Sequence, residues 1–153
     1  MTNEKRRLYK MKMLLISHQG AASGMKTAAS LIAGDMADGI DTIELTAEAG
    51  IESFTEELDT YLKAWKETGK TGVIFADLKG GTPYNKAEIL LAHYGMKEQI
   101  KVISGMNLTM VVECLFQEIS QWSQETLQEI LAAGREGIDC IELSAASTES
   151  EDE

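Results

Sequence analysis

The chain has 153 residues, of which 44% are hydrophobic and 25% charged, and its formal net charge is −11. This composition is typical of one globular domain and argues against a disordered chain. The excess of acid argues against a nucleic-acid groove, which needs a basic surface, and is compatible with a basic protein partner. No apolar run is long enough to be a membrane span or a secretory signal, so we expect a cytoplasmic protein.

We divide the chain into three parts. Residues 1–12 are predicted to be a mobile N-terminal extension, within which Met11 is an alternative natural start. Residues 13–144 are predicted to form the folded domain. Residues 145–153 contain four acidic residues and are predicted to be a frayed acidic tail.

The first half of the chain alternates between strand-like and helical patterns. It predicts a strand over residues 12–16, a helix over about 24–36, a strand over 41–45 and a helix over about 51–65. The helices are inferred from apolar residues that recur every three or four positions, and the strands from short apolar or alternating runs. Ser53 and Glu56 have the spacing of a capping box for the second helix.

The second half continues this alternation. It predicts a strand over residues 73–78, a helix from Thr82, a strand over 99–103, a helix from Asn107, a helical pattern over 122–134 and a short fifth strand over 139–143. Thr82 is a good N-cap, and Pro83 is favoured at the first helical position. The alternation predicts an α/β fold, with a doubly wound, mainly parallel sheet and helices on both faces. We assign this sheet the strand order 2-1-3-4 and expect a short fifth strand at its C-terminal end.

Two cysteines and two histidines are the residues most suited to binding a transition metal. Cys114 and Cys140 lie in apolar contexts without Cys-x-x-Cys spacing, so we expect two buried free thiols. The four residues form no ligand cluster at a familiar spacing, so we expect neither a metal nor an organic cofactor. His93 is expected to be structural, because it lies near the end of a predicted helix, where a cation suits the dipole.

Polar residues follow the first and third predicted strands. His18 follows the first strand, and Asp77 ends the third, just before the Gly80-Gly81-Thr82 loop. In the order 2-1-3-4 these strand ends are neighbours at the point where the order reverses, so we expect His18 and Asp77 to face each other.

A histidine, a carboxylate and a glycine-rich helix start together suit phosphoryl transfer. A carboxylate that accepts the proton of one imidazole nitrogen leaves the other nitrogen nucleophilic. The loop at Gly80, Gly81 and Thr82 leads into a helix N-terminus, where free N–H groups favour an anion. Each feature alone also fits a polar loop or a tight turn; their combination favours phosphoryl transfer through His18.

Four segments resemble the mannose-family enzyme IIA domains of the sugar phosphotransferase system. They are LLISH followed by ASGM at residues 14–25, DLKGGTPYN at 77–85, SGMNLTM at 104–110 and GREGI at 134–138. The resemblance implies that His18 is phosphorylated, that Asp77 orients it, and that Gly81 and Thr82 help to hold the phosphate. It also implies the histidine-containing phosphocarrier protein as donor, a separate IIB component as acceptor, and a homodimer whose last strand lies in the interface. It further implies that the membrane is involved only through the transporter complex.

One residue departs from the family pattern. The family usually has glycine directly after the histidine, whereas this chain has Gln19, followed by Gly20. Gln19 could narrow the phosphate pocket or donate a hydrogen bond to the phosphate. Two alternatives stay open: a phosphotransferase subunit that serves dihydroxyacetone kinase through the same residues, and a regulatory binding module that has lost transfer.

Overall fold

The computed structural model describes Thr2 and residues 11–117 and 119–142, so the predicted extension and acidic tail lie almost entirely outside the described residues. Four strands form one parallel sheet in the order β2-β1-β3-β4, which confirms the predicted order. The elements, in chain order, are β1 (Lys12–His18), α2 (Ala21–Ala33), the 3-10 helix η1 (Gly34–Ala37), β2 (Ile40–Leu45), α3 (Gly50–Thr68), β3 (Gly72–Ala76), α4 (Thr82–Tyr94), β4 (Ile100–Ile103), α5 (Leu108–Phe116) and α6 (Gln124–Glu136).

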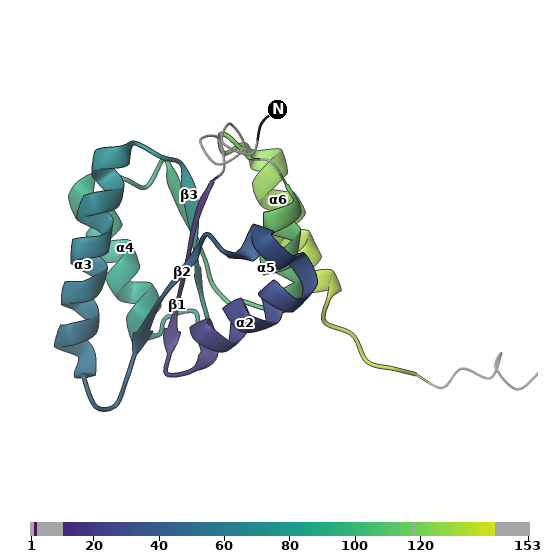
Figure 1. Cartoon of the computed structure of the whole chain (residues 1–153), viewed down its shortest axis with the longest axis horizontal. Coiled ribbons are helices and arrows are strands. Elements are labelled where there is room, and N and C mark those ends of the chain that lie inside the picture. The colour runs from purple at the N-terminus through teal and green to yellow at the C-terminus, as the bar shows by residue number, and fades with distance from the viewer. Residues whose placement is uncertain (1, 3–10, 118, 143–153) are drawn as a thin grey trace, which may run out of the picture.

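Helices cover both faces of the sheet. Helices α3 and α4 lie on one face, and α2, α5 and α6 lie on the other (Figure 1). Successive residues of a strand point to opposite faces. Leu15 and Phe75 therefore pack under α2, α5 and α6, whereas Leu14 and Ile74 pack under α3 and α4. Because both faces of β1 and β3 are covered, residues 13–16 of β1 and all of β3 are apolar, as is usual in parallel sheets.

Two predicted caps are not formed. Helix α3 begins at Gly50 without a side-chain cap, so Ser53 lies inside the helix and makes no capping box with Glu56. Helix α4 begins at Thr82, and its N-cap is Gly81, so Thr82 does not cap the helix. The cap predicted at Asn107 is confirmed, because its side chain accepts a hydrogen bond from the Met110 N–H.

The predicted fifth strand is wrong for residues 139–142, which form no strand; Leu143 lies outside the described residues. Ile141 is 94% exposed, so this apolar side chain has no core to pack against within the described chain. Apolar character alone does not make a strand, because the backbone also needs a hydrogen-bonding neighbour. The same segment makes the prediction of two buried thiols wrong for Cys140, which is exposed, whereas Cys114 is buried.

Candidate active site

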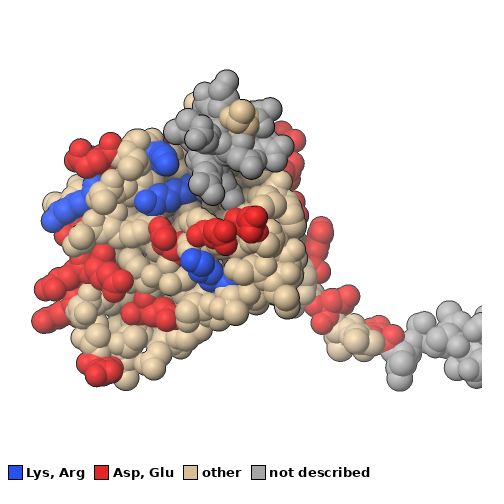
Figure 2. Space-filling view, viewed as in Figure 1, with Lys and Arg blue, Asp and Glu red and all other residues tan. Residues whose placement is uncertain are grey.

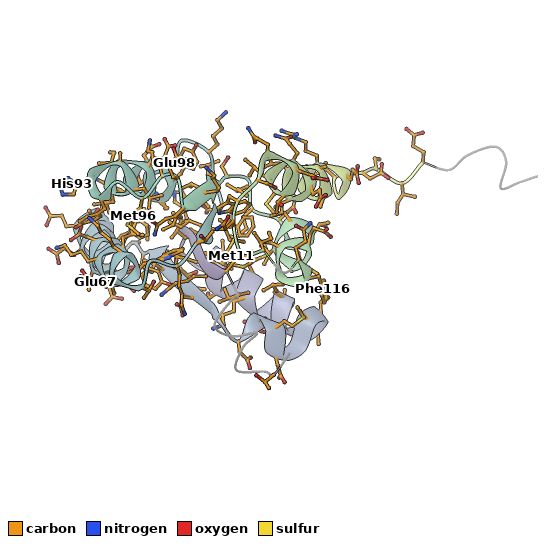
Figure 3. The ribbon with its side chains drawn as sticks, turned by 90° about the horizontal axis from the view of Figure 1, so that it is seen from above. Met11, Glu67, His93, Met96, Glu98 and Phe116 are labelled. Atoms are coloured by element: carbon orange, nitrogen blue, oxygen red, sulfur yellow. The ribbon has the colours of Figure 1, made fainter. Side chains whose placement is uncertain are left out.

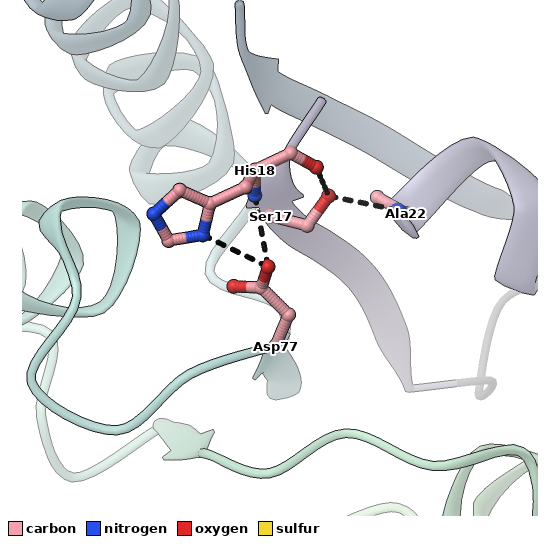
Figure 4. Close-up of polar contacts among 4 residues, drawn as sticks. All are labelled: Ser17, His18, Ala22 and Asp77. Atoms are coloured by element: carbon pink, nitrogen blue, oxygen red, sulfur yellow. Dashed lines mark hydrogen bonds and ion pairs between the residues drawn. The ribbon is translucent and has the colours of Figure 1, made fainter. Parts of the chain in front are cut away.

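The ring of His18 is held by Asp77 across the ends of β1 and β3 (Figure 4). Asp77 Oδ2 lies 2.9 Å from His18 Nδ1 and also accepts the His18 backbone N–H at 3.0 Å. A carboxylate can only accept, so this contact places a proton on Nδ1 and leaves the lone pair on Nε2. Figure 4 shows the second ring nitrogen pointing away from Asp77, and the His18 side chain is 47% exposed. The Nε2 side of the ring is therefore exposed to solvent.

The second oxygen of Asp77 has a different environment. Oδ1 is buried and has no hydrogen-bond partner among the described residues. A buried unpaired oxygen is costly, and a catalytic role is one of the reasons for which native proteins retain such a group. The carboxylate is therefore positioned by His18 and by its own backbone rather than by a complete set of hydrogen bonds.

Ser17 fixes the backbone on which His18 sits, a role that the sequence analysis missed. Its side chain is fully buried; Oγ donates to the His18 carbonyl at 2.6 Å and accepts the Ala22 N–H at 2.8 Å (Figure 4). The hydroxyl thus joins the end of β1 to the first turn of α2. A serine at the end of an otherwise apolar run was the available signal, since a buried hydroxyl needs partners.

Side chains accept two N–H groups in the first turn of α2, those of Ala22 and Ser23. The N-cap of this helix, Gly20, has a left-handed φ of 88° and no side chain to offer. In its place Ser17 accepts the Ala22 N–H, and Glu44 Oε2 accepts the N–H and the hydroxyl of Ser23 at 3.3 and 3.2 Å. The negative charge of Glu44 would repel a phosphate group, so the N-terminus of α2 is a poor phosphate site. Sequence reasoning missed Glu44.

The N-terminus of α4 is open. Within the described residues no acceptor is present for the N–H groups of Thr82 and Tyr84, and Pro83 between them has no N–H. The Thr82 hydroxyl is likewise without a partner there. Free N–H groups and the positive end of the helix dipole favour an anion. The two helix N-termini beside His18 thus differ. Side chains accept N–H groups at the N-terminus of α2, whereas in the described part of the chain N–H groups at the N-terminus of α4 are free to bind an anion.

The glycines of the predicted loop bring this open helix end against the imidazole. Gly80 has a left-handed φ of 78°, and its carbonyl accepts a hydrogen bond from Asn85 Nδ2 at 3.0 Å. A Cβ atom on Gly81 would lie 3.1 Å from His18 Cε1, so a side chain at this position would press on the ring. Gln19 turns elsewhere, because its Oε1 accepts the Ala47 N–H at 3.3 Å. Only its amide N–H groups are left for a ligand.

The other candidate residues lie away from this site. His93 is on the outer surface, in the last turn of α4, with its ring 4.9 Å from that of Tyr94 (Figure 3). No group of three or more His, Cys, Asp or Glu among the described residues is placed to hold a metal ion. Across the same part of the chain, every helix is too short or too polar to cross a membrane.

Residues 12–131, which contain this whole site, match the EIIA-man family, described as the PTS system fructose IIA component. The chain belongs to this family. It is thus a IIA component of the mannose type, in agreement with the resemblance of its sequence segments. No match was found among the curated proteins.

Solved structures agree with this family. The mannose/sorbose-specific IIA subunit of the phosphotransferase system from Enterococcus faecalis is similar with a TM-score of 0.75 and 29% identity, over 88% of this chain and 97% of that one. EIIA from Streptococcus agalactiae gives 0.71 and 25%, over 85% and 96%. The IIA protein associated with the fucose utilization operon from Streptococcus pneumoniae shares the fold, with 0.69 and 21% over 94% and 98%.

Proposed function

We propose that this IIA component receives a phosphoryl group from the histidine-containing phosphocarrier protein on Nε2 of His18 and passes it to a separate IIB component for sugar uptake. The observation that carries the proposal is the 2.9 Å contact between His18 Nδ1 and Asp77 Oδ2. It makes Nε2 the nitrogen with the free lone pair, on the exposed side of the ring. Cytoplasmic placement and membrane contact through the transporter complex alone follow from this role.

In the proposed reaction, Nε2 attacks the phosphorus of the donor's phosphohistidine. The new N–P bond forms as the donor's N–P bond breaks, and the donor nitrogen keeps the electron pair. Positive charge develops on the His18 ring, and Asp77 stabilises it through the Nδ1 proton, which stays on the ring. We propose that the N–H groups of Thr82 and Tyr84, which have no acceptor among the described residues, stabilise the phosphoryl oxygens, with Gly80 and Gly81 allowing the close approach. Transfer to the IIB component is the same step in reverse.

The charge of the surface supports a protein donor. The net charge is −11, and on the face shown in Figure 2 acidic side chains predominate around α3. Such a field increases the rate at which a basic partner associates, and its effect falls with salt. We therefore propose that the surfaces presented by the donor and the acceptor are basic.

We further propose a homodimer that uses the segment after α6. Strand β4 is an edge strand of the described sheet, so one side of its backbone has no partner strand there. Ile138 and Ile141 are 76% and 94% exposed, an unusual exposure for two isoleucines so close in the chain. Pairing of this segment with a second copy would bury them. Light scattering on the full chain and on an Ile141→Glu variant tests this; equal monomer masses for both would reject the homodimer.

The function is tested by phosphoryl transfer from phosphoenolpyruvate through enzyme I and the phosphocarrier protein, followed by mass spectrometry at neutral pH. We expect one acid-labile phosphate on His18 and none in a His18→Ala variant, which should fold normally because a half-exposed side chain leaves no core cavity. His93→Ala is the matched control and should be labelled like the wild type.

The acceptor distinguishes the alternatives. Onward transfer to a IIB component supports the proposal, whereas transfer only to a dihydroxyacetone kinase subunit would support the first alternative. A folded protein that takes no label from an active phosphocarrier would reject the carrier role. That outcome would favour the regulatory binding module and make Gln19→Gly the first variant to test.

A further inference from the structure

The loop between β4 and α5 contacts the strand end that carries Asp77. The Met106 N–H donates to the carbonyl of Ala76 at 3.0 Å, and Ala76 is the last residue of β3. Asp77 follows directly and reaches His18 on the other side, at the end of β1. The peptide that leads into Asp77 is thus held from the β4 side, and its carboxylate is bonded on the β1 side.

Asn107 holds this loop in place through both ends of its amide. Its Oδ1 accepts the Met110 N–H at 3.0 Å in the first turn of α5, and its Nδ2 donates to the Gly134 carbonyl of α6 at 2.8 Å. An amide is one of the few side chains that can accept and donate at the same time in this geometry. Asn107 is half-buried, and it joins two helices at the residue next to Met106.

Two glycines, one within α6 and one at its C-cap, allow α6 to approach α5 closely. A Cβ atom on Gly134 would lie 2.5 Å from Met110 Cε, and one on Gly137 would lie 2.6 Å from Thr109 Oγ1. A side chain at Gly134 would displace the flexible end of Met110, and one at Gly137 would collide with Thr109. The segments at residues 104–110 and 134–138 therefore form one packed unit. Among the described residues, no hydrogen bond joins this unit directly to the side chain of His18 or of Asp77.

We propose that Asn107 is a positioning residue for the phosphoryl acceptor. By fixing Met106 against Ala76, it holds Asp77 at the distance that keeps His18 in the Nδ1–H form. A misplaced carboxylate would release this proton to either nitrogen, since the tautomer is set by the hydrogen bond that the ring makes. This inference deepens the proposed function. Of its two tests, only the measurement of transfer rate depends on the proposed function being right.

The decisive variant is Asn107→Asp, which keeps an oxygen for the Met110 N–H and loses the donor to Gly134. Asn107→Ala loses both bonds. The readout is the ring nitrogen spectrum of the ¹⁵N-labelled, unphosphorylated protein at about pH 8.5, where an ordinary imidazole is neutral. His93 provides an internal reference, because it is the only other histidine. We expect the wild type to show the Nδ1–H form of His18 and the Asp variant to show a mixture with the Nε2–H form.

Transfer to His18 should slow about tenfold or more in the Asn107 variants, as expected for a small misplacement of a reacting group, with little change in the KM for the donor. Ser123→Ala is the matched control. It removes the cap of α6, in which Ser123 Oγ accepts the Thr126 N–H at 3.1 Å, without contacting the β4–α5 loop.

The inference would be overturned if Asn107→Asp kept the wild-type tautomer of His18 and the wild-type transfer rate. It would also be overturned if the transfer rate fell no further in the Asn107 variants than in Ser123→Ala. If Asn107→Ala does not fold, Asn107→Asp alone decides. The spectrum needs no donor protein, so a failure of His18 to accept phosphate would reject the proposed function, while the tautomer would still decide the role of Asn107.

Discussion

Adding one methyl group at Gly81 should impair transfer without unfolding the protein. In Gly81→Ala the new Cβ lies 3.1 Å from His18 Cε1, 3.3 Å from the Leu78 carbonyl oxygen and 3.5 Å from Leu78 Cβ. Carbon atoms pack at about 3.5–4.0 Å, so the ring must move by about 0.5 Å. Such a shift takes the 2.9 Å contact from His18 to Asp77 to the limit of a hydrogen bond.

The change in stability should be small. Gly81 has φ −72° and ψ 167°, an extended conformation that alanine adopts without strain. Replacing a glycine N-cap by alanine costs about 1 kcal/mol, and the loss of freedom in the unfolded chain returns about 0.4–1 kcal/mol. We therefore expect the free energy of unfolding to change by less than about 1 kcal/mol. Misplacement of the nucleophile should slow transfer by about tenfold to a hundredfold.

The assay is the initial rate of His18 labelling at saturating phosphorylated donor, together with urea unfolding. Gly39→Ala is the control, because a Cβ there meets nothing within 4 Å and its φ is not left-handed; it should transfer at the wild-type rate. A wild-type rate in Gly81→Ala would refute the close contact. If the slow rate of Gly81→Ala were accounted for by a fraction of unfolded protein, the prediction that transfer is impaired while stability is kept would be refuted.

Three further outcomes are expected. Asp77→Ala should still be labelled, but more slowly, in single-turnover labelling, because orientation is lost and the nucleophile is kept; an unchanged rate would remove Asp77 from the mechanism. Hydrogen bonds from Tyr94 and then Lys63 lower the pKa of Asp59, so the stability this carboxylate adds at neutral pH should disappear as the pH falls below its ordinary value of 3.8. Urea unfolding at several pH values should show the deficit of Asp59→Asn shrinking over that range, whereas a constant deficit would contradict the shift. Burial raises the pKa of the Cys114 thiol to about 12, so a thiol reagent at about pH 8 should label only Cys140 until the chain is unfolded; two fast thiols in the folded protein would contradict this burial.

The sequence alone predicted the alternation of strands and helices as far as α6, and the polar residues His18 and Asp77 at the ends of the first and third strands. These depend on local signals, namely apolar periodicity and the residues that follow each strand. Parallel strands end at one edge of the sheet, so polar residues after neighbouring strands must meet there. Asn107 was also predictable as a cap, because capping depends on the few residues that follow it.

Only the tertiary structure decided how these residues are held. Glu44 reaches Ser23 across 21 positions, and Asn107 reaches Gly134 across 27, so no local pattern contains either contact. That Glu44 lies at the N-terminus of α2, whereas the N-terminus of α4 is left open among the described residues, was likewise visible only in the folded chain. The missing fifth strand has the same cause. Residues 139–142 (DCIE) alternate polar and apolar residues as a strand does, but a strand also needs a neighbour, and only the folded chain shows which edges are available.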